Sequence, residues 1–273
     1  MSLIYQQLVE TTAFIRTRIH TEATIGIILG SGLGNLAREI KTEISIPYNE
    51  IPHFPVSTVE GHGGNLIYGE LNGVKVWVMQ GRFHFYEGYT AQQVAYPVRA
   101  LHMLGVKTLL LSNAAGGVNP AFHVGDLMII KDHISLFTIN PLLGKNEEKL
   151  GTRFPDMSEP YSKAIIKQVE AIAEAHQIKL HQGVYLGVTG PTFETRAEYK
   201  LIRAVGGDAV GMSTVQESIA AIHCGMNVFA ISVITDLGIR EEENTITHDE
   251  VLEAAKNAEP KLTLLFKELV KNL

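Results

Sequence analysis

The stretch TIGIILGSGLG, residues 24–34, indicates the fold class of this chain. It begins with a predicted strand at 24–29 that lacks polar side chains after Thr24, which is typical of a strand buried on both faces of a parallel sheet. The glycine-rich segment 30–34 follows directly and leads into a short helical pattern. Neighbouring backbone N–H groups in such a turn can hold an anion. The segment lacks the third glycine of a dinucleotide site and the lysine of a P-loop, so we expect neither of these sites.

Strand-like and helix-like segments alternate outward from this stretch to both ends of the chain. Predicted strands are 24–29, 65–71, 74–80, 108–112, 126–131, 183–188, 209–212 and 228–235, and predicted helices are 91–104, 162–176, 196–204, 215–223 and 248–270. The alternation predicts an α/β fold: a single three-layer domain over residues 1–273, with a central mixed, largely parallel β-sheet flanked by helices. The segment 141–160 has the weakest pattern, and a loop of that length is usually functional or mobile.

Composition excludes several classes of protein. The 273 residues are 45% hydrophobic and 19% charged, with a net charge of -6, which suits a globular protein without a nucleic-acid or anionic-membrane surface. Cys224 is the only cysteine, so no disulfide can form within the chain, and its apolar surroundings predict a buried side chain. The N-terminal segment lacks a signal-peptide pattern, and no apolar run reaches membrane-spanning length. We therefore expect a cytoplasmic protein.

Polar side chains follow the predicted strand at 74–80. Arg82, His84 and Glu87 lie there among three aromatic residues. Arginine suits phosphate because its guanidinium can donate two hydrogen bonds to neighbouring oxygens, and Glu87 could orient His84. His84 and Glu87 lack a third ligand at a metal-binding spacing, so we expect no metal site.

Other predicted strands end in comparable motifs. The segment 113–117, NAAGG, is predicted to be a second small-residue turn, and GPTFET at 190–195 offers Phe193 for stacking on a flat heterocycle and Glu194 for accepting ring N–H bonds. Ligand sites of α/β proteins usually lie beyond the carboxyl ends of the strands. We therefore expect one group of strand-end residues to converge: Gly30, Arg82, Asn113, Glu194, Ser213 and Asp236.

Eight stretches carry a resemblance to a known family. They are LGSGLG, FPVSTVEGHGG, MQGRFHFYEGY, SNAAGGVNP, RFPDMS, GPTFET, DAVGMSTVQE and THDEV, and they run in family order across nearly the whole chain. Together they resemble the trimeric, low-molecular-mass class of purine nucleoside phosphorylases, in a family that also contains methylthioadenosine phosphorylases. The resemblance implies the phosphorolysis of purine ribo- and deoxyribonucleosides to the free base and (deoxy)ribose 1-phosphate, in purine salvage.

The resemblance also implies roles for individual residues. Phosphate would be held by Ser31, Arg82, His84, the backbone N–H of Ala114, Ser213 and His62. The nucleoside would be held by Tyr86, Phe193, Glu194, Val210, Met212, Asp236 and His248, and the catalytic residues would be His84, Glu194 and Asp236. Phe154 would reach into the neighbouring subunit's site in a homotrimer. Inorganic phosphate would be a co-substrate, and no metal or organic cofactor is implied.

Asp236 departs from the pattern of the members restricted to 6-oxopurines, which have asparagine there. The sequence ITD at residues 234–236, at the end of the last predicted strand, is similar to that of methylthioadenosine phosphorylases. The motifs GPTFET and VEGHGG are not similar to theirs. Inosine and guanosine are the expected substrates, and adenosine is possible.

Three alternatives stay open. A methylthioadenosine phosphorylase should favour an apolar 5′-pocket over His248. A nucleoside hydrolase has no need of an anion cradle made by Ser31, Arg82 and His84. A non-catalytic purine-binding protein would bind without turnover.

Overall fold

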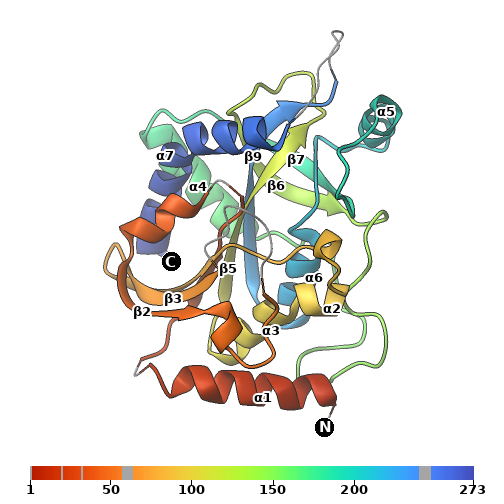
Figure 1. Cartoon of the computed structure of the whole chain (residues 1–273). Coiled ribbons are helices and arrows are strands. Elements are labelled where there is room, and N and C mark those ends of the chain that lie inside the picture. The colour runs from red at the N-terminus through yellow and green to blue at the C-terminus, as the bar shows by residue number, and fades with distance from the viewer. Residues whose placement is uncertain (1, 20, 32, 57–63, 240–246) are drawn as a thin grey trace.

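The computed structural model describes every residue except 1, 20, 32, 57–63 and 240–246, and its centre is a mixed sheet with helices on both sides (Figure 1). The strands are β1 (Ile25–Ile28), β2 (Lys41–Pro47), β3 (Asn65–Leu71), β4 (Val74–Gln80), β5 (Thr108–Gly117), β6 (Leu127–Ile134), β7 (Leu180–Gly187), β8 (Ala209–Gly211) and β9 (Asn227–Leu237). The helices are α1 (Leu3–Arg16), α2 (Ala91–Val94), α3 (Tyr96–Met103), α4 (Lys163–Ala175), α5 (Arg196–Ala204), α6 (Val215–His223) and α7 (His248–Asn272), with 3-10 turns at η1 (Gly34–Glu39), η2 (Tyr48–Glu50) and η3 (Phe85–Glu87).

The strand order is β2-β3-β4-β1-β5-β8-β7-β6-β9, and β9 pairs back onto β5. Parallel pairs join β4 to β1, β1 to β5, β5 to β9, β6 to β7 and β7 to β8. Antiparallel pairs join β2 to β3, β3 to β4, β5 to β8 and β6 to β9. The expected mixed sheet is confirmed. The sequence did not predict that five strands, β5, β8, β7, β6 and β9, close into a ring.

The predicted turn at 113–117 is wrong, because β5 continues through it to Gly117. This half of the strand pairs with β9 on one side and with β8 at Gly116 and Gly117 on the other. A Cβ on Gly117 would lie 2.9 Å from the Ile234 Cγ2 atom, and one on Gly116 would lie 2.9 Å from the Asp236 Oδ2 atom. The small residues are therefore needed for close strand packing and not for a turn.

Two other elements differ from the prediction. The strand β2 was not predicted, because it lies at the edge of the sheet and Ile46 is its only fully buried residue. The predicted helix 91–104 is two helices, α2 and α3, which meet at Ala95 just before Pro97. Proline lacks an N–H and favours a helix start, which fits this break.

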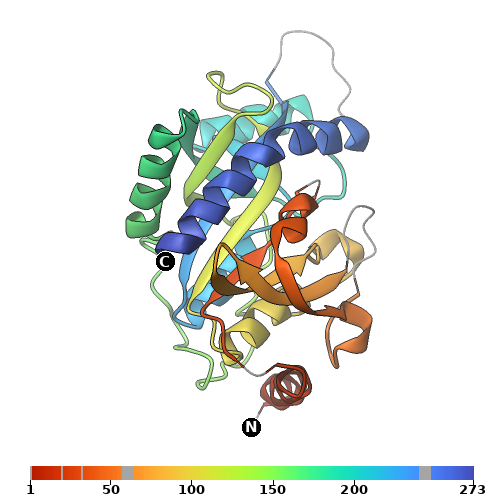
Figure 2. The ribbon, with the colours of Figure 1, turned by 90° about the vertical axis from the view of Figure 1, so that its left-hand side faces the viewer.

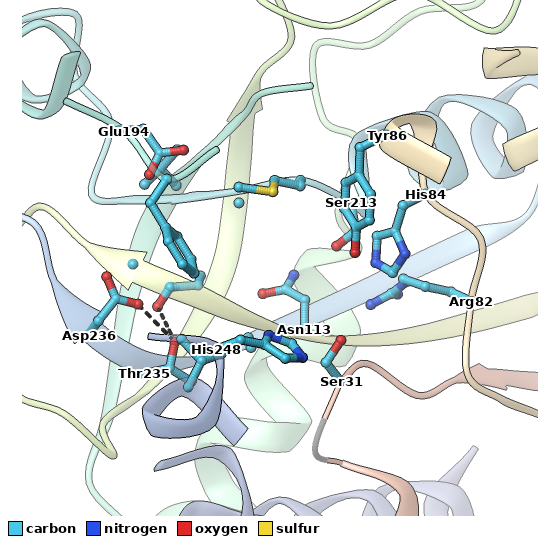
Figure 3. Close-up of a pocket in the computed structure, with 18 residues that line it drawn as sticks. Ser31, Arg82, His84, Tyr86, Asn113, Glu194, Ser213, Thr235, Asp236 and His248 are labelled. Carbon is cyan, nitrogen blue, oxygen red and sulfur yellow. Dashed lines mark hydrogen bonds between the residues drawn. The ribbon is translucent and has the colours of Figure 1, made fainter. Parts of the chain in front are cut away.

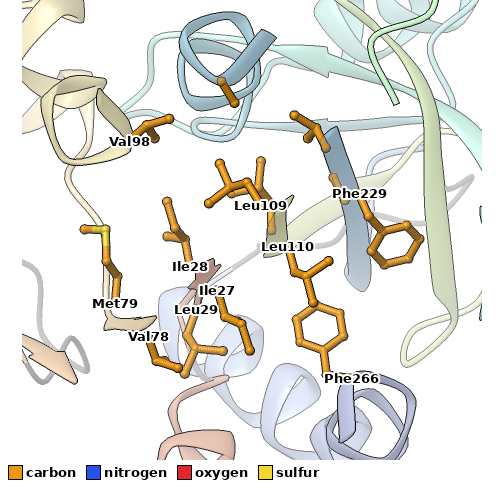
Figure 4. Packing of buried hydrophobic residues seen from close by; sticks show 14 of the residues in the cluster. Ile27, Ile28, Leu29, Val78, Met79, Val98, Leu109, Leu110, Phe229 and Phe266 are labelled. Atoms are coloured by element: carbon orange, nitrogen blue, oxygen red, sulfur yellow. The ribbon is translucent and has the colours of Figure 1, made fainter. Parts of the chain in front are cut away.

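Buried apolar side chains fill both sides of the central strands. Figure 4 shows Val98 of α3 and Phe266 of α7 on opposite sides of β1 and β5, with Ile27, Ile28 and Leu110 between them. The helices α4 and α7 pack side by side (Figure 2), while α3 packs on α6. Cys224 is buried, as expected. No helix within the described ranges is long and apolar enough to span a membrane, and the single-domain reading stays a prediction.

Candidate active site

One pocket lies where the strands β1, β4, β5, β8 and β9 end (Figure 3). It is lined by most of the residues expected in the site: Ser31, Arg82, His84, Tyr86, Ala114, Phe193, Glu194, Val210, Met212, Ser213, Asp236 and His248. Arg82, His84 and Ser213 lie at one end of the pocket, and Glu194 and Asp236 lie at the other. The convergence of these residues is observed, and their roles stay predictions.

Two expected site residues are not among those that line the pocket. Phe154 is 86% exposed in the loop before α4, where the Arg153 guanidinium lies 5.5 Å from its ring centroid. The Phe154 side chain therefore does not line the pocket of its own chain. His62 lies outside the described residues.

Arg82 is fixed by a buried carboxylate. Its Nε and Nη2 atoms donate to the two oxygens of Glu217 at 3.0 Å each, and Nη1 donates to the Ser112 carbonyl at 2.5 Å. Arg82 is 1% exposed and Glu217 is 3% exposed. Buried charges require partners, and this bidentate pair holds the guanidinium in one plane. Glu217 was not predicted as a site residue, and its only sequence signal is an acidic residue within an apolar helix.

His84 is oriented by Glu87, as the sequence suggested. The His84 backbone N–H donates to the Glu87 Oε1 atom at 2.8 Å, and the His84 Nδ1 atom lies 3.1 Å from the same oxygen. The ring stacks on Tyr86 with centroids 4.6 Å apart. Burial lowers the pKa of His84, and the hydrogen bond to Glu87 opposes that change. In the neutral ring, a proton on Nδ1 leaves Nε2 as the acceptor nitrogen.

The loop after β1 passes close to Arg82 because residue 30 is glycine. A Cβ there would lie 2.8 Å from the Asn113 Cα atom and 3.1 Å from the Arg82 Nη1 atom. Both distances are below those of ordinary contacts, so a larger residue would push the loop outward. Ser31 therefore reaches the pocket beside Arg82 only because Gly30 has no side chain.

Thr214 has a backbone conformation that is unusual for a β-branched residue. Its φ is 71°, in the left-handed region. The Asn113 Nδ2 atom donates to the Thr214 hydroxyl at 2.9 Å, and the Ser213 and Thr214 hydroxyls lie 3.1 Å apart. Strained residues held by such contacts are frequent at functional sites, where they position a neighbour. Here the neighbour is Ser213.

The opposite end of the pocket is acidic. The Thr235 hydroxyl donates to the Asp236 Oδ1 atom at 3.0 Å. Burial raises the pKa of Glu194, and the charge of Asp236 adds to the rise. A nearby negative charge disfavours the ionised form of a carboxyl group, so Asp236 favours the protonated form of Glu194.

Tyr199 is the second residue that the sequence did not identify. It is 4% exposed, and its ring lies against Gly238, where a Cβ would be 2.2 Å from the ring. Its hydroxyl makes no hydrogen bond of regular geometry within the described ranges, yet it is near enough to Glu194 to lower the pKa of that carboxyl. From sequence, Tyr199 is only an aromatic residue on a predicted helix.

Known proteins with this sequence pattern and fold identify the class. The family model described as "Phosphorylase superfamily" matches residues 24–271. The chain is 50% identical over 264 residues to purine nucleoside phosphorylase 1 of Geobacillus stearothermophilus, covering 97% of this chain and 96% of that protein. It is 46% identical over 276 residues to the purine nucleoside phosphorylase of Rattus norvegicus, covering 98% and 96%.

Solved structures agree with these relatives. The Schistosoma mansoni purine nucleoside phosphorylase in complex with inosine matches with a TM-score of 0.93 and 41% identity, over 98% of this chain and 96% of that one. A Schistosoma mansoni purine nucleoside phosphorylase in complex with adenosine matches with a TM-score of 0.93 and 42% identity, over 98% of this chain and 97% of that one. The chain therefore belongs to the phosphorylase superfamily and, within it, to the purine nucleoside phosphorylases.

Proposed function

We propose that this chain cleaves purine nucleosides with inorganic phosphate, releasing the free purine and ribose 1-phosphate or its deoxy form. The observation that carries the proposal is a single pocket with a buried arginine and histidine at one end and two carboxyl groups at the other. That arrangement suits a substrate pair with an anion on one side and a hydrogen-bonding heterocycle on the other. Family membership supports the same reaction.

The phosphate end would bind and orient the nucleophile. Because Glu217 already pairs with Arg82, the guanidinium is oriented before phosphate enters. Ser31, Ser213 and the Ala114 N–H would add donors, while the neutral His84 would accept a proton from phosphate. Because phosphate is held against the sugar, its attack does not depend on a chance encounter of the two molecules in solution, and this lowers the barrier.

The sugar would lie between the two ends. Tyr86 and Met212 line the same pocket, as does His248, which begins α7. We assign Tyr86 and Met212 to the ribose hydroxyls and His248 to the 5′-hydroxyl. The presence of His248 argues against a methylthioadenosine phosphorylase, whose substrate carries an apolar 5′-group.

Cleavage builds positive charge on the ribose and negative charge on the departing purine. Contacts that strengthen as these charges appear increase the rate. The phosphate would stabilise the ribosyl cation and then capture it. Asp236, facing N7, would stabilise the departing base or protonate it at N7 and be left ionised, while Glu194 would hold the base at N1. General acid help of this kind contributes about 10²–10⁴-fold. Val210 and Phe193 would cover the faces of the base.

Asp236 is proposed to set the base preference. An ionised Asp236 accepts N7–H, but its other oxygen faces the O6 atom of a 6-oxopurine, so two acceptors meet without a proton. Facing the 6-amino group of adenine, the same oxygen is satisfied. A mismatched buried acceptor costs about 1–3 kcal/mol.

We expect Asp236→Asn to raise the inosine-to-adenosine ratio of kcat/KM by about tenfold or more, since the amide donates to O6. The measurement is the initial rate of base release from each nucleoside. An unchanged ratio would show that residue 236 does not read the 6-position.

The decisive test of the reaction is its dependence on phosphate. Inosine, guanosine, adenosine and methylthioadenosine are incubated with and without phosphate, and base and sugar products are followed. We expect base release from inosine and guanosine to require phosphate and to yield ribose 1-phosphate. Equal rates without phosphate would identify a hydrolase, and binding without turnover would identify a purine-binding protein. We further propose that the enzyme is a cytoplasmic homotrimer acting in purine salvage, with phosphate as its only co-substrate.

A further inference from the structure

Arg99 on α3 is a buried arginine outside the catalytic pocket. It is 5% exposed, and within the described ranges it makes no ion pair and no hydrogen bond, its Nε atom being fully buried. Arg82 is equally buried but is paired with Glu217 and Ser112. A charge removed from water without a partner is unfavourable in a folded protein. The Arg99 guanidinium therefore lacks an anionic partner.

A cavity of about 340 Å³ lies beside Arg99, and we call it the Arg99 pocket. It is formed by α1, α2, α3, the end of α6 and residues 141–147, and it shares no lining residue with the catalytic pocket. Its polar lining includes Gln7, Gln93 and Lys145, which can donate hydrogen bonds, while Gln92 and Asn146 each already donate one to a backbone carbonyl. The cavity is therefore suited to a ligand that accepts hydrogen bonds.

Two titratable residues beside Arg99, Glu147 and His223, are already engaged with other residues of the chain. Glu147 is the only acid among the described lining residues, and its Oε2 atom already accepts from the Ser2 N–H at 3.1 Å and from the Ser2 hydroxyl. His223 is buried, and its Nδ1 atom has no hydrogen bond of regular geometry within the described part of the chain. Burial lowers the pKa of His223, and the charge of Arg99 lowers it further. The His223 Nε2 atom lies 3.2 Å from the Asn146 Oδ1 atom, so a neutral His223 donates its one proton there and offers the pocket no further donor.

We infer that the Arg99 pocket binds a small oxyanion, for which inorganic phosphate is the probe. The planar guanidinium can donate two hydrogen bonds to such an ion, and Lys145 lies exposed where it can attract one. The same chemistry could come from a carboxylate of a second copy of the chain, because Leu142 and Leu143 line both this pocket and the surface around Phe154. Of the two sources we propose the free ion, because a small ion can reach Arg99 through the half-open pocket without a docked subunit.

The test is calorimetric titration of phosphate into the full chain and two variants. We expect two binding events per native chain, one in Arg99→Met and one in Arg82→Ala. Loss of a charge-assisted contact should weaken the second event by about ten- to a hundredfold in Arg99→Met, while phosphorolysis is retained. In Arg82→Ala, phosphate binding in the Arg99 pocket should be retained, whereas phosphate binding in the catalytic pocket and phosphorolysis should be weakened. If the chain were not a phosphorylase, the Arg99-dependent event would still be seen, so the two proposals fail separately.

Lys145→Gln is a surface variant that should fold normally and weaken the same event by a few-fold, as exposed charges do. A native chain with one phosphate event, or Arg99→Met with two, would overturn the inference. Light scattering distinguishes the two sources. An Arg99→Met chain that loses its oligomeric state, beside a native chain with one phosphate event, would show that a neighbouring subunit supplies the carboxylate.

Discussion

Arg82 and Glu217 form a two-hydrogen-bond ion pair between β4 and α6 that no ligand has to assemble. The pair explains how a buried cation is kept in the pocket that we propose to bind phosphate. It also means that changes at Arg82 have two separable effects, on phosphate binding and on stability.

We expect Arg82→Ala to raise the KM for phosphate by about ten- to a hundredfold, with a much smaller change for the nucleoside. The variant should also lose about 3–5 kcal/mol of unfolding free energy, because Glu217 becomes an unpaired buried charge. Adding Glu217→Gln should recover much of the stability but not the phosphate affinity. Steady-state kinetics and denaturant unfolding measure the two effects. A change in the nucleoside KM alone would show that Arg82 has another role.

The raised pKa of Glu194 predicts a pH dependence of base choice. Burial raises that pKa, so a larger fraction of Glu194 is protonated at a given pH than in water. Protonated Glu194 can donate to N1 of adenine, whereas the ionised form accepts N1–H of a 6-oxopurine. The adenosine-to-inosine ratio of kcat/KM should therefore rise as pH falls through this pKa.

Tyr199→Phe is the matched variant for this prediction. It keeps the ring against Gly238 but removes the hydroxyl that lowers the pKa of Glu194. The pKa should rise further, so the increase in the adenosine ratio should begin at a higher pH than in the native chain. Identical pH profiles would exclude a role for Tyr199 in positioning Glu194.

Individual site residues were predictable where a polar or charged residue comes shortly after an apolar predicted strand. Arg82, His84 and Asp236 stand at such places, and Glu87 is close enough in sequence to be linked with His84. Glu217 and Tyr199 were not predictable in the same way, because their partners, Arg82 and Glu194, come to them only through the tertiary fold. The sequence also gave no sign of a cavity beside Arg99.

At the scale of elements, glycines set how closely the strands and loops approach one another. Gly30 and Gly34 belong to one glycine-rich segment, yet their surroundings differ. A Cβ on Gly30 would meet the backbone of Ser112 and Asn113 at 2.8 Å, whereas one on Gly34 would meet nothing within 4 Å. The sequence pattern treats the two as equivalent, and packing distinguishes them.

We expect Gly30→Ala to cost about 1–3 kcal/mol of stability, because backbone atoms cannot move aside as a side chain can. The displaced loop carries Ser31, so the KM for phosphate should rise as well. Gly34→Ala is the control from the same segment and should change neither quantity appreciably. Thermal unfolding and phosphate saturation curves provide the comparison. Equal effects of the two substitutions would contradict this account.

Elements were predictable where the apolar pattern was continuous. The strands β3 and β4 and the helices α5 and α6 have the predicted bounds. The errors at β2 and in the second half of β5 arose from pairing: an edge strand needs little apolar sequence, and a strand of alanines and glycines looks like a turn until its two neighbours are known.

At the scale of the whole molecule, Phe154 is the most exposed large hydrophobic side chain among the described residues. An aromatic ring that is 86% exposed contributes little to the stability of the subunit, but it could complete a neighbouring site. Light scattering tests directly whether the active form is a trimer.

We expect Phe154→Ala to leave thermal stability nearly unchanged and to raise the nucleoside KM by about ten- to a hundredfold, the effect of losing a buried phenyl contact. Oligomers assembled from mixed Phe154→Ala and Arg82→Ala chains should regain activity. In such mixtures an intact pocket of one variant can receive the intact Phe154 of the other. Mixtures no more active than their components would mean that each chain works alone.

The strand ring has a consequence for how this chain is made. The hairpin of β3 and β4 forms from adjacent segments, but the pairing of β5 with β9 joins Thr108 to Asn227. Pairing between segments so distant in sequence is entropically costly and slow. During synthesis β5 therefore cannot pair with β9 until residues up to the end of β9 have emerged. Until then the apolar residues 109–111 of β5 lack β9 as a neighbour. The incomplete chain would be prone to aggregation and open to binding by chaperones in this interval, well before any purine could bind.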